Sequence, residues 1–265
     1  MRAYGERTGF PSKTGLYTSP HLIYPEERIR IGFRPISRGL FAKYFFEVWN
    51  SLLSDAENRP LPRYLQLMAL TAFHAFIMEN VEATIIETHH GGEYDATNVI
   101  EAPLVTMVTA LGMDHVQQLG PSVENIAWHK SGIFKPGAYA LSVLQDDCVA
   151  DVLRKRATEK DVNLVFVNDD SALPNEALHL RPDVQRTNCS LALAGTRAFL
   201  KAKSRDHEFA LLPQDVRQGV ERFMWPGRFQ VIEDGTSRWY LDGAHNEMSI
   251  VKAAEWYIDL TKAAG

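Results

Sequence analysis

The feature that most constrains the fold of this chain is the alternation of short apolar strand patterns with longer amphipathic helix patterns. Apolar residues after Ser37 recur every three or four positions, which predicts an amphipathic helix with Ser37 as its N-cap. Further helices are predicted over 64–78, 122–130, 149–159, 188–201 and 247–257, and strands over 81–87, 104–109, 138–144, 162–167, 229–232 and 239–241. This alternation predicts an α/β fold with a doubly wound, mostly parallel sheet, whose ligands bind at the carboxyl ends of the strands.

Composition, charge and cysteine content exclude several classes of protein. The 265 residues are 45% hydrophobic and 23% charged, which excludes wholesale disorder and a disulfide scaffold. The net charge of -5 argues against nucleic acid as the main partner. Cys148 and Cys189 are the only cysteines, so we expect reduced thiols in an intracellular protein. No apolar run approaches the ~18–20 residues of a membrane span.

A change of composition between Lys203 and Gly227 predicts a domain boundary. This stretch is charged and contains proline and glycine, so we place the boundary near 205–225. The sequence then predicts a central domain over 1–215 and the start of a second domain over 216–265. Because about 40 residues are fewer than usually fold alone, we expect this second unit to be incomplete.

Two predicted strands end in acidic and imidazole side chains. The strand over 81–87 ends in Glu87 and runs into Gly91-Gly92, and the strand over 104–109 leads to Asp114 and His115. Carboxylate oxygens suit Mg²⁺, and adjacent glycines let a backbone approach a phosphate closely. We interpret the two strand ends as one metal–nucleotide site, with ordinary βα turns as the alternative.

Two later segments have both a functional and a structural interpretation. His129 and Lys130 lie at the end of a predicted helix, where the helix dipole alone would favour basic residues. Asp242, His245 and Asn246 lie at a strand-to-helix turn, where they either contact a ligand or cap the last helix.

Several motifs occur in order between about residues 2 and 257. They are Gly15–Leu22, Glu27–Ile31, Gly91–Asn98, Gly112–His115, Ile126–Ile133, Arg181–Asn188, Trp225–Arg228 and Trp239–His245. In this order they resemble the folylpolyglutamate synthase family of the Mur ligase superfamily, in its fungal versions. Matches at many separate motifs are far more specific than any single one.

The resemblance implies an ATP-dependent ligation. In this family a folate γ-carboxylate is phosphorylated to an acyl phosphate, and the amine of L-glutamate displaces the phosphate. The expected substrates are reduced folates and L-glutamate, and the expected cofactors are ATP and Mg²⁺, with a monovalent cation as a further candidate. Because two like-charged reactants must meet, Mg²⁺ and basic groups are expected to neutralise charge. The resemblance also implies a cytoplasmic or mitochondrial protein that is monomeric when complete.

The resemblance implies metal and catalytic roles for four residues. Ser19 and Glu87 match the ligands of one Mg²⁺, and Glu87 with His115 match those of a second. Lys130 matches a carbamoylated lysine, which requires a site that first favours the neutral amine. Lys130 and His115 are therefore the expected catalytic residues.

The resemblance also implies residues for substrate and nucleotide. Arg28 is expected to contact an anionic substrate. The loop beside the folate pocket matches Thr18, Ser19, Pro20 and His21. The residues expected to bind nucleotide are Asn188, Arg228, Asp242 and His245.

Several features depart from the family pattern. The glycine-rich phosphate-binding loop would precede this chain, and no GxxxxGK(S/T) motif occurs in it, since Ser12-Lys13-Thr14 lacks the glycine before its lysine. We therefore expect a central domain without this loop and without the first strand of its sheet. His89 stands where the family has glycine, so its ring is expected either to crowd the phosphate path or to bind a metal. Glu26 stands where a basic residue is common.

Two other classes of function stay open at this point. A chain without the phosphate loop is alternatively a folate- or nucleotide-binding remnant, or an interaction subunit that borrows a strand from a partner. A metal-dependent hydrolase would instead require His89, His90, Asp114 and His115 to converge on one open metal site.

Overall fold

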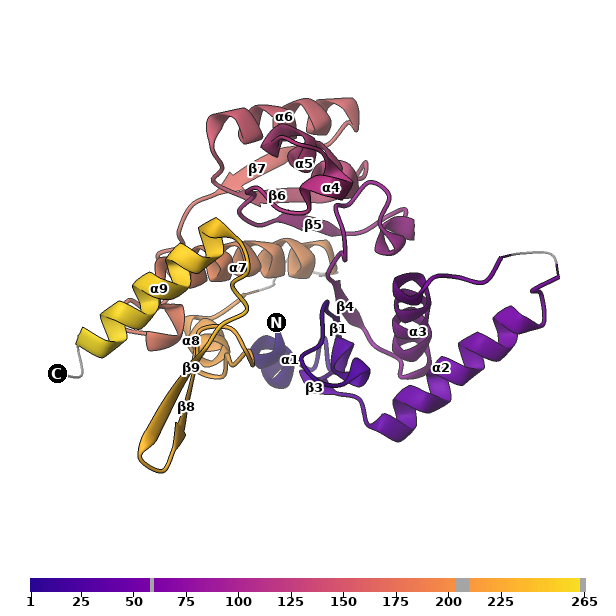
Figure 1. Ribbon diagram of the computed structural model, residues 1–265, viewed down its shortest axis with the longest axis horizontal. Coiled ribbons are helices and arrows are strands. Elements are labelled where there is room, and N and C mark those ends of the chain that lie inside the picture. Colours follow the sequence, from indigo (N-terminus) through magenta and orange to yellow (C-terminus); the bar gives the residue numbers. More distant parts are fainter. Residues whose placement is uncertain (58–59, 204–209, 263–265) are drawn as a thin grey trace. The chain divides into compact units, whose positions relative to one another are not determined.

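The computed structural model describes residues 1–57, 60–203 and 210–262, and it confirms the predicted α/β class. The chain forms two compact units, Met1–Glu101 and Ala102–Gly265 (Figure 1). In the described ranges, none of the helices combines the length and the apolar character that crossing a bilayer requires.

The first unit is built on a four-stranded mixed sheet with the order β3-β2-β1-β4. Strand β1 (Thr14–Tyr17) is parallel to β4 (Ala83–Ile86), and Tyr17 lies opposite Ile86. Strand β2 (Ile29–Ile31) is antiparallel to β1, and β3 (Arg34–Pro35) is antiparallel to β2. The other elements are α1 (Arg2–Thr8), the 3-10 helices η1 (Pro25–Arg28) and η2 (Ala96–Val99), α2 (Arg38–Leu53) and α3 (Tyr64–Met78).

Helices α2 and α3 supply most of the core of the first unit. Helix α2 begins as predicted, because the Ser37 hydroxyl accepts the Leu40 N–H at 3.2 Å. It lies alongside α3 (Figure 1), and small alanines on α3 allow a close approach to the sheet. The buried residues of this core are Tyr17, Ile29, Ile36, Tyr44, Met68, Ala72, Ala75 and Phe76.

The second unit contains a parallel three-stranded sheet with the order β5-β6-β7. Its elements before residue 204 are β5 (Val105–Val108), α4 (Val116–Leu119), α5 (Val123–Lys130), η3 (Ser131–Ile133), β6 (Tyr139–Val143), α6 (Asp147–Glu159), β7 (Leu164–Val167), η4 (Leu178–Leu180) and α7 (Asp183–Lys203). Those after residue 209 are α8 (Pro213–Glu221), β8 (Gln230–Asp234), β9 (Ser237–Leu241) and α9 (Glu247–Lys262). Strands β8 and β9 form an antiparallel hairpin.

Helices cover both faces of the parallel sheet, as the doubly wound prediction requires. Successive residues of a strand point to opposite faces. Ala140 of β6 therefore packs in a cluster with residues of α5 and α6, whereas Leu141 and Val143 pack against Leu191 of α7. Figure 1 shows α5 and α6 on one side of this sheet and α7 on the other.

The last helix packs on the hairpin through aromatic residues, among them Trp256 and Tyr257, whose rings both contact Tyr240. Trp256 of α9 is buried, with its ring 5.5 Å from that of Phe229 and 5.7 Å from that of Tyr240. Edge-to-face pairs of this kind are favourable at such separations.

The structure adds elements that the sequence analysis did not predict. Strands β1, β2 and β3 precede Ser37, where the sequence analysis predicted no element, because strands this short show no readable period. Helix α8 lies within the stretch predicted to hold the domain boundary, where Val216 and Val220 are buried at a helical spacing. Helix α7 begins at Asp183, five residues before the predicted start. The predicted boundary at 205–225 stays a prediction, and residues 204–209 lie outside the described ranges.

Replacement of Tyr44 by Phe should destabilise the first unit in a pH-dependent way. The buried Tyr44 hydroxyl donates to Glu79 Oε1 at 2.7 Å, and this bond, aided by Lys13, lowers the pKa of the Glu79 carboxyl. A depressed carboxyl pKa stabilises the fold above the ordinary value of about 4.3, and that contribution is lost as the pH falls below it. We expect Tyr44→Phe to lower the free energy of unfolding by about 1–2 kcal/mol at pH 7 and by less at pH 3. Denaturant titration at both pH values checks this, and an equal loss at both would contradict it.

Candidate functional site

The first candidate site lies where the parallel strands β1 and β4 end. The Glu87 N–H donates to the Tyr17 carbonyl at 2.9 Å, which extends the pairing one residue beyond β4. The Glu87 carboxylate accepts both the Thr18 hydroxyl and the Ser19 N–H, the latter at 3.1 Å. The predicted metal ligands Ser19 and Glu87 are therefore in direct contact.

Arg28 joins the loop after β1 to the start of β2. It is only 5% exposed, and its guanidinium donates to Ser19 Oγ at 2.7 Å and to His21 Nδ1 at 2.9 Å. The Arg28 carbonyl accepts the Thr18 N–H at 2.9 Å. A buried guanidinium that bonds to these neutral groups can attract an anion to the loop.

The residues predicted for substrate and the first metal thus lie together in the first unit. We name them the Ser19–Glu87 cluster: Thr18, Ser19, Pro20, His21, Arg28 and Glu87. Their roles remain predictions. Lys13 does not belong to this cluster, because its amine donates to the Glu79 carbonyl at 2.7 Å.

A buried hydrogen-bonded set that the sequence analysis missed adjoins the cluster. His89 Nε2 lies 2.5 Å from the Tyr17 hydroxyl, and His89 Nδ1 lies 3.4 Å from Asp95 Oδ1. The His89 side chain is 2% exposed and that of Asp95 is 3% exposed. The ring of His89 is therefore turned into the unit, contrary to the expectation that it crowds the phosphate path or binds a metal. The same burial counts against the hydrolase hypothesis.

The electrostatics of this set follow from burial and hydrogen bonding. Burial raises the pKa of the Tyr17 hydroxyl to about 12, so Tyr17 keeps its proton at neutral pH. Burial alone would raise the pKa of Asp95, but hydrogen bonds from His89, Thr97 and His90 hold it well below its usual range. The signal in the sequence was an aspartate six residues after a histidine, which is too unspecific to predict contact.

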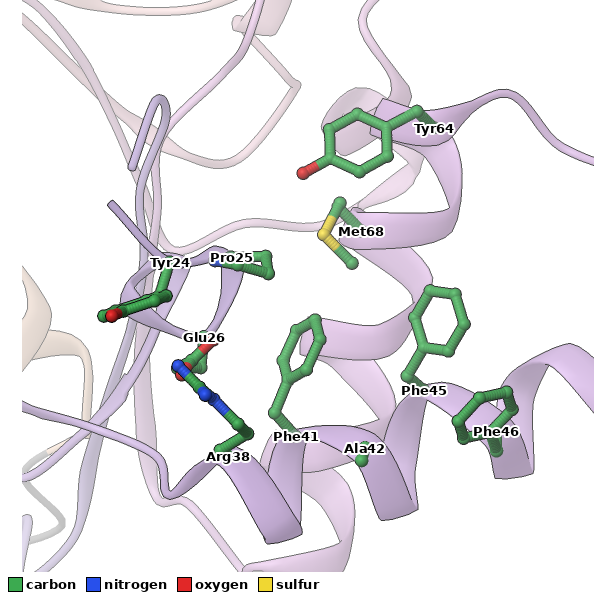
Figure 2. Close-up of a pocket in the computed structure, with 10 residues that line it drawn as sticks. All are labelled: Tyr24, Pro25, Glu26, Arg38, Phe41, Ala42, Phe45, Phe46, Tyr64 and Met68. Atoms are coloured by element: carbon green, nitrogen blue, oxygen red, sulfur yellow. The ribbon is translucent and has the colours of Figure 1, made fainter. Parts of the chain in front are cut away.

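A cavity with five aromatic side chains among its ten lining residues lies beside η1, between α2 and α3 (Figure 2). Its volume is about 530 Å³, within the range of small-molecule sites. Arg38 lies at one side, paired with Glu26 at 3.1 Å and 4.5 Å from the centre of the Tyr24 ring. The Tyr64 ring also lies 5.8 Å from the Arg28 guanidinium, which connects the cavity to the cluster. The lining residues are Tyr24, Pro25, Glu26, Arg38, Phe41, Ala42, Phe45, Phe46, Tyr64 and Met68.

The sequence analysis did not predict this cavity. It interpreted the apolar spacing after Ser37, which includes Phe41 and Phe45, as one face of an amphipathic helix. The structure packs these two side chains against the core and also along the hollow, and Phe46 beside them is 56% exposed.

The second candidate site lies in the second unit, around Asp114. One carboxylate oxygen of Asp114 is 3.6 Å from His115 Nε2 and 3.6 Å from His245 Nε2. The loop before Asp114 is held by Gln145, which accepts the Leu111 N–H at 3.0 Å. His115, which was predicted to bind metal, and His245, which was predicted to bind nucleotide, therefore lie beside the same carboxylate oxygen of Asp114. Glu87 belongs to the other unit, so its convergence with His115 stays a prediction.

Arg228 and Asp242 lie at the base of the β8–β9 hairpin. Asp242 accepts the N–H groups of Phe229 and Ala244, each at 2.8 Å. The Arg228 guanidinium lies so close to Gly243 that a Cβ there would be 1.7 Å from it, so a side chain at this position would require Arg228 to move. His245 Nδ1 lies 2.9 Å from the Gly243 carbonyl. Three of the four residues predicted to bind nucleotide are therefore neighbours.

The remaining predicted residues lie on two helices of the second unit. Lys130 is the last residue of α5, in the last turn with His129, where the helix dipole favours a cation. Asn188 is half-buried in α7, next to Thr187, whose hydroxyl donates to Asp169 at 3.1 Å. The cap interpretation of Lys130 and the carbamate interpretation both fit this position.

The donors of the Ser19–Glu87 cluster fit Mg²⁺ by their chemistry. A carboxylate and a hydroxyl oxygen are the ligands that this hard cation prefers. Across the described ranges, no group of three or more His, Cys, Asp or Glu side chains could hold a metal ion. A Mg²⁺ bound to Ser19 and Glu87 would therefore take its other ligands from phosphate and water, as Mg²⁺ commonly does.

Comparisons with known proteins place these residues in a family context. No protein-family model matches the chain. It is 42% identical over 272 residues to folylpolyglutamate synthase of Neurospora crassa, covering 97% of this chain and 51% of that protein. It is 40% identical over 266 residues to folylpolyglutamate synthase of Saccharomyces cerevisiae, covering 94% and 48%. The chain thus spans about half the length of the curated relatives it matches.

A solved structure shares the fold. The chain matches a complex of folylpolyglutamate synthase with AMPPCP and folate at a TM-score of 0.82 and 25% identity, over 97% of this chain and 67% of that one. The predicted resemblance is confirmed at the level of sequence and fold. Along nearly its whole length, the chain is therefore a relative of the folylpolyglutamate synthases.

Proposed function

We propose that the chain carries the site of an ATP-dependent ligase that adds L-glutamate to the γ-carboxylate of reduced folates. The observation that carries this proposal is the Ser19–Glu87 cluster, in which a carboxylate, a hydroxyl and a buried guanidinium meet at two parallel strand ends. The same residues lie in a chain 40–42% identical to folylpolyglutamate synthases. Parallel strand ends are where α/β proteins bind their ligands.

We assign Arg28 to an anionic group of the substrate. Its guanidinium is buried and is fixed by bonds to Ser19 and His21, so it attracts a carboxylate without having to reorganise. The charge of Arg28 would then offset the repulsion between a folate carboxylate and a nucleotide phosphate.

We assign the aromatic cavity to the ring system of the folate. Aromatic walls bind a flat heterocycle by stacking, and Tyr64 lies between the cavity and Arg28. A ligand with an aromatic head and an anionic tail suits this arrangement. The similar solved complex contains folate, which supports the assignment.

Glu87 and Ser19 would hold a Mg²⁺, and the second unit would contact the nucleotide. When bound, Mg²⁺ neutralises charge on the phosphates. Glu87 supplies the anionic ligand and Ser19 a neutral one. We assign nucleotide contacts to Arg228, Asp242, His245 and Asn188, and catalytic roles to Lys130 and His115. The AMPPCP in the similar complex supports nucleotide binding.

A folate-binding chain that does not ligate is the second candidate. The observation that favours it is that the residues assigned to folate, around Arg28 and the aromatic cavity, belong to the first unit, whereas those assigned to nucleotide belong to the second.

Incubation of the chain with tetrahydrofolate, L-glutamate, ATP and Mg²⁺ separates the two candidates. The ligase predicts a mass gain of one glutamyl unit on the folate, detected by mass spectrometry and dependent on ATP. Folate binding by calorimetry without that mass gain would select the second candidate. A chain that shows neither folate binding nor turnover would refute both candidates.

Replacement of Glu87 by Gln should weaken Mg²⁺-dependent nucleotide binding. The amide keeps the shape of the side chain but removes the anionic ligand, so we expect the Kd for AMPPCP with Mg²⁺ to rise at least about tenfold. Glu101→Gln is the matched control, because Glu101 is an exposed carboxylate of the same unit. Calorimetry measures both variants, and an unchanged Kd in Glu87→Gln would contradict the metal assignment.

If Lys130 is carbamoylated, labelled bicarbonate should yield a labelled carbamate on its side chain. With ¹³C-bicarbonate, the chain should show a carbamate carbon signal by NMR, and Lys130→Ala should remove it. Lys155→Ala, on the exposed face of α6, should leave the signal intact. Absence of the signal in the unsubstituted chain would instead support the helix-cap interpretation.

A further inference from the structure

A buried chain of side-chain contacts links the two strand ends that carry Ser19 and Glu87. It runs from the Tyr17 hydroxyl through the His89 ring to the Asp95 carboxylate. Tyr17 is the last residue of β1, two positions before Ser19, and His89 follows Glu87 by two positions. None of these three side chains touches solvent appreciably.

The neighbouring groups determine where the His89 ring carries its proton. An ionised carboxylate is an acceptor only, and Asp95 Oδ1 faces His89 Nδ1, so Nδ1 carries the hydrogen. His89 Nε2 faces the Tyr17 hydroxyl, 2.5 Å away, so the ring contacts Asp95 on one side and β1 on the other.

Asp95 is fixed on the far side of the ring. Its Oδ2 accepts the N–H groups of His89 and His90 at 3.0 and 2.8 Å, and its Oδ1 accepts the Thr97 N–H at 2.9 Å and the Thr97 hydroxyl at 2.6 Å. These bonds fold residues 89–97 around one carboxylate, with Gly91 in the left-handed region at φ 68°. The ring therefore has a fixed support on one side and β1 on the other.

We propose that Tyr17, His89 and Asp95 are positioning residues that hold the Glu87 carboxylate against Ser19, and so set how tightly the Ser19–Glu87 cluster binds a Mg²⁺–nucleotide. The choice of a Mg²⁺–nucleotide as the ligand rests on the proposed function, whereas the positioning of the Glu87 carboxylate does not. The bond between Tyr17 and His89 spans the same two strand ends that the metal ligands span. Partners behind the ligands of a site commonly determine its affinity in this way.

The tautomer of His89 tests the contact chain without any substitution. In ¹⁵N-histidine-labelled protein, we expect the Nδ1 signal of the His89 ring to show a bonded hydrogen, because Nδ1 faces the Asp95 carboxylate. A ring without hydrogen on Nδ1 would overturn the inference.

Amide exchange at Ser19 tests the positioning. The Ser19 N–H is bonded to Glu87, so displacement of Glu87 exposes it. We expect Tyr17→Phe to speed Ser19 exchange about tenfold, because the ring of His89 loses its link to β1. Tyr44→Phe is the matched control: it also removes a buried tyrosine hydroxyl from this unit, but that hydroxyl contacts Glu79. Equal Ser19 exchange in the two variants would overturn the positioning role.

A second variant serves if Tyr17→Phe does not fold. His89→Asn keeps an N–H for Asp95 but offers nothing to the Tyr17 hydroxyl, so it should also speed Ser19 exchange. Unchanged exchange of the Ser19 N–H in His89→Asn would overturn the proposal, just as unchanged exchange in Tyr17→Phe would.

Calorimetry with AMPPCP and Mg²⁺ completes the test. We expect Tyr17→Phe to raise the Kd about tenfold and Tyr44→Phe to leave it unchanged. If the unsubstituted chain binds no nucleotide, the proposed function fails, while the tautomer and the Ser19 exchange still decide the positioning.

Discussion

The parallel pairing of β1 with β4 is the interaction on which the candidate site depends. It sets Tyr17 opposite Ile86, so the residues that follow both strands leave the sheet at the same edge. Glu87 and Ser19 are far apart in the sequence, and this pairing alone brings them into contact. The antiparallel strand β2 then places Arg28 against the same loop. An acid, a hydroxyl and a buried cation therefore meet at one edge of the sheet.

The second unit applies the same principle with a fully parallel sheet. Helices on both faces bury β6 on two sides, which leaves the strand ends as the place for polar loops. Asp114 lies in one such loop and meets His245 from the turn before α9. The hairpin base adds Arg228 beside Gly243. These residues form a polar group of mixed charge, which suits recognition of a nucleotide more than closure of a hydrophobic core.

Sequence patterns predicted the longer elements well, because burial imposes a readable period on them. Ser37 caps α2 and the 64–78 helix matches α3 residue for residue, since caps and apolar spacing are local signals. The two- to four-residue strands β1 to β3 gave no period. The contact of His89 with Tyr17 depends on strand pairing across 72 residues, which no local pattern encodes. Glu87 was found because it ends a strand, whereas Asp95 was missed as a site residue because its role depends on how the following turn folds.

A structure of the chain with AMPPCP and Mn²⁺ in place of Mg²⁺ tests the central assignment most directly. Anomalous scattering locates the manganese without reference to the surrounding atoms. The account predicts a manganese peak bound by a Glu87 carboxylate oxygen and the Ser19 hydroxyl, beside the phosphates of the nucleotide. A nucleotide bound elsewhere, or a manganese peak away from both of these side chains, would contradict it.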